Sequence, residues 1–262
     1  MTKFKKFKWQ KQPVNFLKLI PNILTISALC IGCTSIRFAL DAKWEQAAFC
    51  IVIAAILDGI DGRVARFLNA TSTFGAELDS LCDFINFGLS PVLITYLWIF
   101  NQYSIKLISW GVVLFFSTAT ALRLARFNTM ALSPLEDKTF SKFNIGIPSP
   151  AGALLAILPL INELEMKDYT GFSFHAHPLI IGLYQSIIAF LMVSTVPTFS
   201  PKNISIQPKR MGIVLIFVAA NLIMIFLHTW VMLPIYGLIY LLSMPYSYRQ
   251  WKEFNSSQIS KI

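Results

Sequence analysis

Five of the chain's 13 acidic residues lie in one apolar stretch, Leu57–Phe84. Charged side chains in or beside a membrane are costly, so such a group usually has a compensating partner and a function. Four of the five are aspartates at helical spacings: Asp58 and Asp61 are three residues apart, and Asp79 and Asp83 are four apart. On a helix, both spacings place the two side chains on one face. We therefore expect two helices to present four carboxylates to each other.

Four facing carboxylates repel one another strongly unless a cation neutralises them. Mg²⁺ and Mn²⁺ suit such a group because they prefer oxygen ligands, and substrate phosphates often complete their coordination. Gly62 and Gly75 lack side chains where a phosphate or sugar must come close, and Ala65 keeps the same face open. Arg66 supplies a fixed positive charge. The alternative, a set of interfacial salt bridges at helix ends, does not explain why two glycines lie in register with the aspartates.

The composition places these residues in a membrane protein. Hydrophobic residues make up 55% of the 262 residues and charged residues 13%, whereas an average soluble domain has about 25% charged residues. The fold class is therefore all-α, a polytopic bundle of about eight transmembrane helices. The predicted spans are Phe16–Leu40, Trp44–Leu57, Leu78–Phe100, Ile105–Leu122, Pro148–Ile161, Pro178–Val196, Met211–His228 and Trp230–Met244.

The second predicted span is short, but its helical pattern continues beyond the apolar part through Asp58 and Asp61 to Arg66. We expect this helix to protrude into the cytoplasm. A polar turn, Asn69–Thr73, then returns the chain to a third helix that begins near Gly75. This arrangement brings the aspartates of the two helices together at the membrane surface.

The basic residues lie mostly on one side of this predicted topology. Of the 22 Lys and Arg residues, only Arg37, Lys43, Lys106 and Lys167 fall in the connections on the other side. This asymmetry is typical of the positive-inside rule and predicts that both termini are cytoplasmic. It also accounts for the net charge of +9 without a nucleic-acid partner, because no basic soluble module is visible.

The aspartates belong to a longer pattern, Asp58-x2-Asp61-Gly62-x2-Ala65-Arg66-x8-Gly75-x3-Asp79-x3-Asp83. It resembles, without departure, the signature of the CDP-alcohol phosphatidyltransferases. The resemblance implies a membrane enzyme in which an alcohol displaces CMP from a CDP-linked lipid. It also implies that Asp58, Asp61 and Asp79 bind two divalent cations, Mg²⁺ or Mn²⁺, and that Asp83 is both a metal ligand and the general base.

Other segments resemble the bacterial and archaeal phosphatidylserine synthases of this family. They are Pro21-Asn22-x2-Thr25, Asp83-Phe84-x2-Phe87-Gly88-x2-Pro91, Arg123-Leu124-Ala125-Arg126-Phe127-Asn128 and Phe143-x2-Gly146-x-Pro148-x-Pro150. The resemblance implies transfer of the phosphatidyl group of CDP-diacylglycerol to the hydroxyl of L-serine by metal-assisted direct displacement, giving phosphatidylserine and CMP. Alternative acceptors are glycerol 3-phosphate, choline and inositol. A cation-coupled membrane carrier is the alternative from another class.

Candidate substrate-binding residues follow from these segments. Those expected to contact the CDP-lipid are Gly62, Ala65, Arg66, Gly75, Asn22 and Thr25. Asn22 has a second interpretation, as part of the helix start. Arg123 and Arg126 suit the acceptor's carboxylate or the lipid phosphate, or anchor the helix by the positive-inside rule. Asn128 either binds the acceptor or caps the helix, and Lys142 either reaches an anionic headgroup or is a solvated surface lysine.

We divide the chain into four parts. They are a basic cytoplasmic N-terminal segment (1–15), a catalytic membrane core (16–161), additional transmembrane helices (162–247) and a cytoplasmic tail (248–262). We expect the protein to lie among the lipids of the cytoplasmic (inner) membrane of a prokaryote, with its active site facing the cytoplasm. The family resemblance implies a homodimer. Cys30 and Cys33 form a C-x-x-C pair, which we interpret as two small residues of a membrane helix rather than a metal or redox site.

Overall fold

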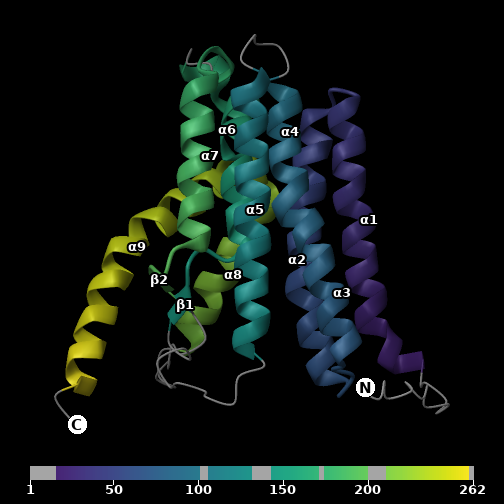
Figure 1. Cartoon of the computed structure of the whole chain (residues 1–262), viewed down its shortest axis with the longest axis vertical. Coiled ribbons are helices and arrows are strands. Elements are labelled where there is room, and N and C mark those ends of the chain that lie inside the picture. The colour runs from purple at the N-terminus through teal and green to yellow at the C-terminus, as the bar shows by residue number, and fades with distance from the viewer. Residues whose placement is uncertain (1–15, 101–105, 132–142, 171–173, 200–210, 260–262) are drawn as a thin grey trace, which may run out of the picture.

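The computed structural model describes residues 16–100, 106–131, 143–170, 174–199 and 211–259. Over these ranges the chain is mostly helical, as predicted, and the long helices run side by side (Figure 1). The α-helices are α1 (Ile20–Leu40), α2 (Trp44–Phe67), α3 (Thr73–Asp83), α4 (Ser90–Trp98), α5 (Lys106–Ala131), α6 (Ser149–Thr170), α7 (Pro178–Val193), α8 (Met211–Leu227) and α9 (Thr229–Ile259). The short elements are η1 (Phe16–Leu19), η2 (Phe84–Leu89), η5 (Phe174–Ala176), β1 (Phe143–Ile145) and β2 (Pro197–Phe199).

Four segments of the described chain are long and apolar enough to cross a membrane. They are Leu17–Leu40, Thr73–Trp98, Leu107–Met130 and Thr229–Lys252. Many of their large apolar side chains point outward; Leu107, for example, is 86% exposed and Leu242 69%. Such surfaces are stable against lipid, so the chain is a membrane protein. The total of eight spans stays a prediction.

Helix α1 packs closely against its neighbours because it turns small side chains inward. Its buried residues Thr25, Ala28, Gly32, Ser35 and Ala39 recur every third or fourth position and form one stripe along the helix. Small residues let two membrane helices approach each other closely. At the first turns of α1 the stripe faces the last turns of α2, where Thr25 contacts Asp61. Further along, it faces η2, where a Cβ at Gly32 would meet Asn86.

The turn between α2 and α3 follows the prediction. α2 continues past the aspartates to Phe67, and Asn69 then adopts a left-handed backbone with φ of 48°, a conformation that asparagine tolerates better than most residues. The Ser72 hydroxyl caps α3 by accepting a hydrogen bond of 3.0 Å from the Gly75 N–H. This cap starts α3 at Thr73, slightly earlier than the predicted start near Gly75.

The third predicted span is not a regular α-helix. Directly after Asp83 the chain forms η2, a π-helical turn, before it continues as α4. Within η2, Gly88 is buried, and a Cβ there would lie 2.9 Å from Thr120 Cβ on α5. The glycine thus lets α5 pack closely against the turn. π-Helical turns inside α-helices occur frequently at functional sites.

The described chain also contains a short two-stranded sheet, which the all-α prediction did not include. β1 pairs antiparallel with β2, with Phe143 opposite Phe199 and Ile145 opposite Pro197. Gly146 follows β1 with φ of 70°, and a Cβ there would lie 2.5 Å from the Met192 carbonyl oxygen. Only glycine fits this conformation and this close approach. Strands of three residues are too short to show the alternating pattern by which a strand is predicted.

Candidate active site

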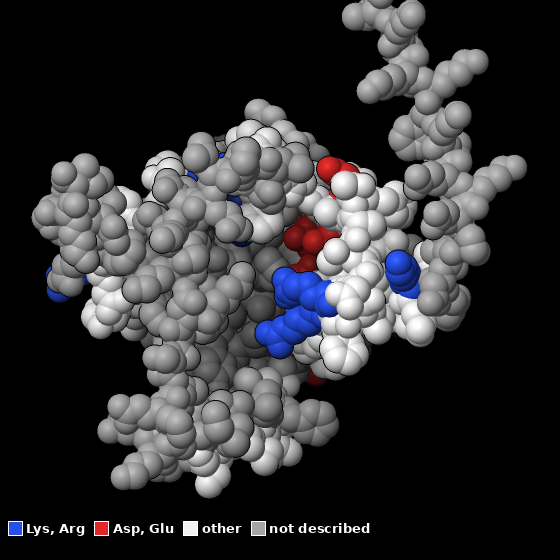
Figure 2. All heavy atoms as spheres, turned by 90° about the horizontal axis from the view of Figure 1, so that it is seen from below, with Lys and Arg blue, Asp and Glu red and all other residues white. Residues whose placement is uncertain are grey.

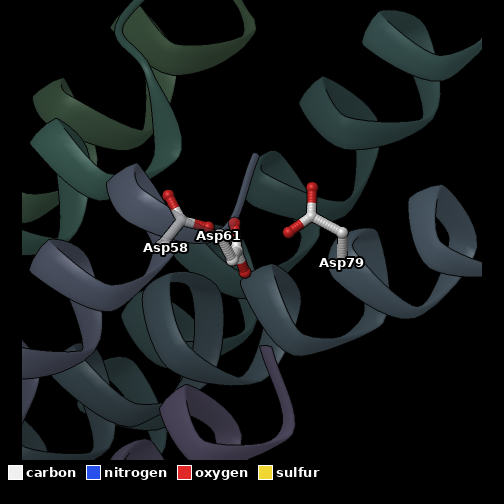
Figure 3. A group of neighbouring side chains, drawn as sticks. All are labelled: Asp58, Asp61 and Asp79. Atoms are coloured by element: carbon white, nitrogen blue, oxygen red, sulfur yellow. The ribbon is translucent and has the colours of Figure 1, made fainter. Parts of the chain in front are cut away.

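Three of the four predicted aspartates converge between α2 and α3. Asp58 and Asp61 lie on α2 and Asp79 on α3, and the carboxylates of the two helices point toward each other (Figure 3). One carboxylate oxygen of each residue lies within 4.8 Å of those of the other two. Asp61 is 5% exposed, and the other two are partly buried. This convergence agrees with the helical spacing for three residues, whereas the fourth predicted aspartate, Asp83, is not part of the set.

The electrostatics of this group favour a cation. Burial raises the pKa of Asp61, and the neighbouring Asp58 carboxylate raises it further, whereas the Thr25 hydroxyl lowers it. Burial likewise raises the pKa of Asp58. Both aspartates follow the apolar part of α2, which ends at Leu57. Three converging carboxylates in partly desolvated surroundings form a donor set that fits a hard divalent cation.

Asp83 lies close to this group but outside the set of three. It is the last residue of α3, and its carboxyl shares a hydrogen bond with that of Asp58. The Arg123 guanidinium, from α5, interacts electrostatically with it. Asp83 thus lies between the carboxylate group and the partly buried Arg123 guanidinium.

Thr25 holds one of the carboxylates in position. Its Oγ1 lies 2.6 Å from Asp61 Oδ2 and 3.0 Å from the Pro21 carbonyl oxygen in its own helix. Both Thr25 and Asp61 are buried. The sequence predicted Thr25 as a contact for the CDP-lipid, but in the structure the hydroxyl donates to the carboxylate and fixes its orientation.

The two signature glycines differ in their surroundings. At Gly62 a Cβ would meet no atom within 4 Å, so the space at this position is open. At Gly75 a Cβ would lie 3.1 Å from both Asn22 Oδ1 and Ser72 Oγ. Gly62 therefore leaves room for a ligand, whereas Gly75 makes room for side chains of the protein itself. Asn22, which lies on α1, accordingly packs beside the first turn of α3.

Basic side chains lie beside the carboxylates at the same end of the bundle. Arg66 is exposed one turn beyond Gly62 on α2, and Ala65 next to it is partly buried. Figure 2 shows acidic side chains set back from the surface with basic side chains next to them. An anionic group that approaches from this end would meet positive charge before it reaches the carboxylates.

The polar residues at the end of α5 contact other parts of the protein. Arg123 donates to Ser149 Oγ at 2.6 Å, and its Nε is buried without a hydrogen-bond partner among the described residues. Arg126 donates to two carbonyl oxygens at the end of α7, those of Val193 at 2.8 Å and Ser194 at 3.3 Å. Both arginines therefore join α5 to segments that follow it in the chain.

Asn128 joins α5 to α3. Its Nδ2 donates to Ser80 Oγ at 2.9 Å, and Ser80 lies between the two aspartates of α3. Neither predicted role, acceptor binding or helix capping, describes this contact. The predicted contact of Lys142 lies outside the described residues.

Sequence reasoning missed three serines that support the site. Ser72 caps α3, Ser80 binds Asn128, and Ser149 holds Arg123. Only Ser72 had a sequence signal, because a serine between a polar turn and an amphipathic segment is typical of an N-cap. The partners of the other two depend on which helices are neighbours.

Comparisons with known proteins agree with this geometry. The family model of the CDP-alcohol phosphatidyltransferases matches residues 18–182. A Mycobacterium tuberculosis protein named CDP-diacylglycerol–serine O-phosphatidyltransferase is 33% identical over 84% of this chain and 76% of its own length. Proteins of the same name from Helicobacter pylori and Bacillus subtilis are 36% and 31% identical, over 79% and 69% of this chain and 83% and 89% of their own lengths. The chain belongs to the CDP-alcohol phosphatidyltransferase family.

Proposed function

We propose that this protein transfers the phosphatidyl group of CDP-diacylglycerol to the hydroxyl of L-serine, giving phosphatidylserine and CMP. The observation that carries the proposal is the convergence of Asp58, Asp61 and Asp79 across the α2–α3 turn, in a chain of this family. The name of the relatives, which cover most of this chain, supports serine as the acceptor.

The three carboxylates would hold two divalent cations, Mg²⁺ or Mn²⁺. When bound, the cations would neutralise charge on the diphosphate and on the oxygens that gain charge as the phosphorus–oxygen bond to CMP breaks. Thr25 fixes the Asp61 carboxylate for this role. The open space at Gly62 admits the diphosphate, and the exposed Arg66 guanidinium attracts it.

Asp83 accepts the proton of the serine hydroxyl as its oxygen attacks the phosphorus that carries diacylglycerol. This role suits its position, because its carboxyl contacts Asp58 and stands beside the three converging carboxylates. The attack displaces CMP directly, without a covalent enzyme intermediate. The carboxyl proton then leaves to solvent before the next turnover.

Arg123 is the residue we assign to the serine carboxylate. It carries the positive charge next to Asp83, and Ser149 fixes one of its terminal nitrogens. A guanidinium in this place would align the hydroxyl of an amino acid with the proton acceptor. The contacts of Arg126 and Asn128 with α7 and α3 give these residues structural roles instead.

We also propose the membrane arrangement that the sequence predicts. The start of α1, the α2–α3 turn and the end of α9 lie at one end of the bundle (Figure 1). The positive-inside pattern supports placing this end, and with it the active site, in the cytoplasm of a prokaryote with an inner membrane. The proposal also includes eight membrane spans, the division of the chain into the four parts given above, and a homodimer.

Purified protein in detergent, supplied with CDP-diacylglycerol and Mn²⁺, tests the choice of acceptor. Serine should release CMP and form phosphatidylserine, whereas glycerol 3-phosphate, choline and inositol should not. Release of CMP with another alcohol and not with serine would refute the serine assignment but keep the reaction class. No release with any alcohol by a folded, metal-loaded protein would refute the enzyme assignment.

A further inference from the structure

The last helix is longer than a membrane crossing requires. α9 has 31 residues, which corresponds to about 46 Å of helix, whereas the hydrocarbon core of a bilayer is about 30 Å thick. Its composition changes at Pro245. Before this residue the helix is almost entirely apolar, and after it come Tyr246, Tyr248, Arg249, Trp251 and Lys252.

The segment Tyr246–Lys252, which we call the α9 foot, has two distinct faces. Met244 just before it and Ser247 within it are buried against the protein. Tyr246 is 61% exposed and Tyr248 49%, and Arg249 and Lys252 are exposed as well. The outward face of the foot therefore combines aromatic rings with positive charge.

The aromatic side chains of the foot are organised along the helix. The rings of Tyr248 and Trp251 stack with their centroids 6.2 Å apart, and Gln250 donates a hydrogen bond of 2.8 Å to the Tyr246 hydroxyl. Tyr and Trp have apolar rings with a polar edge, and they are enriched where a membrane meets water. The foot has the chemistry of that boundary.

The position of the foot fits the same boundary. Earlier on α9, Leu238 and Leu242 are 61% and 69% exposed and form an apolar surface suited to hydrocarbon. The foot continues this surface toward the end of the bundle where the α2–α3 turn lies (Figure 1). A helix that passes from hydrocarbon into aromatic and basic residues meets the headgroup layer at that point.

We propose that the α9 foot binds an anionic phospholipid surface. The charge complementarity of Arg249 and Lys252 identifies the partner: each basic residue near such a surface favours anionic over neutral lipid by about fivefold at moderate salt. The aromatic rings fix the depth of the helix, and the two cations select the headgroup. The inference is independent of the acceptor alcohol, because no residue of the foot takes part in the proposed reaction.

Fluorescence of Trp251 tests the proposal on the full-length protein reconstituted in phosphatidylcholine vesicles. A fraction of the lipid carries brominated acyl chains, either on phosphatidylcholine or on anionic phosphatidylglycerol. The contribution of Trp251 is the difference between the fluorescence of the native protein and that of the Trp251→Phe variant. Brominated phosphatidylglycerol should quench this signal several-fold more than the same fraction of brominated phosphatidylcholine. The preference should disappear at about 1 M salt, where screening is nearly complete.

Two pairs of variants make the test specific. Arg249→Gln with Lys252→Gln should bring the quenching ratio to about one, whereas Arg249→Lys with Lys252→Arg should keep it. Arg37→Gln, which removes an exposed arginine near the C-terminal end of α1, should also keep the quenching ratio of the native protein. Equal quenching by both lipids in the native protein, or absence of quenching by either, would overturn the proposal. Survival of the preference in the double glutamine variant would overturn it as well. The salt series on the native protein decides even if that variant does not fold.

Discussion

Replacement of Thr25 by valine removes one hydroxyl from the site and keeps the shape of the side chain. The hydroxyl donates to the Asp61 carboxylate at 2.6 Å, and both residues are at least 94% buried. Without it, the carboxylate loses the donor that fixes its orientation, and water cannot easily replace that donor. We expect the Thr25→Val protein to fold normally and to bind divalent cations more weakly.

The magnitude follows from the charge and burial of the acceptor. A hydrogen bond to an ionised group contributes about 1.5–3 kcal/mol, and about 1.4 kcal/mol corresponds to a tenfold change in an equilibrium constant. The Mn²⁺ concentration for half-maximal CMP release should therefore rise by about 10- to 100-fold, the range typical of residues that support a metal ligand. At saturating Mn²⁺ the kcat should recover to within about fivefold of the native value.

The assay measures initial rates of CMP release across a Mn²⁺ series at saturating CDP-diacylglycerol and serine. Thr34→Val is the matched control, because the Thr34 hydroxyl lies on the same helix and donates only to the Cys30 carbonyl oxygen at 2.7 Å. It should leave the Mn²⁺ dependence unchanged. An unchanged Mn²⁺ dependence in Thr25→Val, with a raised KM for CDP-diacylglycerol at saturating Mn²⁺, would refute the reasoning and make Thr25 a substrate contact.

Three further predictions concern the rest of the site. Asp83→Asn should lower kcat by at least about 100-fold, while Mn²⁺ should still raise the Tm of this variant. Asp79→Asn should abolish the Mn²⁺-dependent rise in Tm. Loss of that rise in Asp83→Asn as well would contradict the prediction. Gly62→Ala places a methyl group in open space, so the Tm should not fall, whereas the KM for CDP-diacylglycerol should rise. Gly59→Ala, which also places a methyl group in open space, is the control. An equal rise in KM in that variant would argue against a ligand at Gly62. Arg126→Gln removes two hydrogen bonds to the end of α7, so the Tm should fall by several degrees with little change in the KM for serine; the reverse result would identify an acceptor-binding residue.

The helix bounds could be predicted wherever apolar runs end at polar or helix-breaking residues. α1 ends at Leu40, α2 begins at Trp44 and α7 begins at Pro178, as the sequence indicated. The π-helical turn η2 could not be predicted, because it depends on close packing of Gly88 against Thr120 on another helix. The β1–β2 pairing depends in the same way on contacts between distant segments.

The carboxylate site was more predictable than its supports. The spacing of Asp58 and Asp61 fixes one face of α2, so a single reversal of the chain brings Asp79 to them. The partners of Thr25 and Asn128 depend on the positions of whole helices around the site. Residue type alone predicted a polar contact for each but could not distinguish a substrate from another helix.

The segments beyond the region that matches the family model also reach the site. The match ends at residue 182, but Arg126 binds carbonyl oxygens at the end of α7, and β2 pairs with β1. From β1 the chain passes through Gly146 to Ser149, which holds Arg123 beside Asp83. These contacts form a continuous path of hydrogen bonds, peptide links and direct electrostatic interactions. The end of α7 and β2 therefore help to set the position of Arg123. The chain after residue 182 is therefore part of the scaffold that positions Arg123.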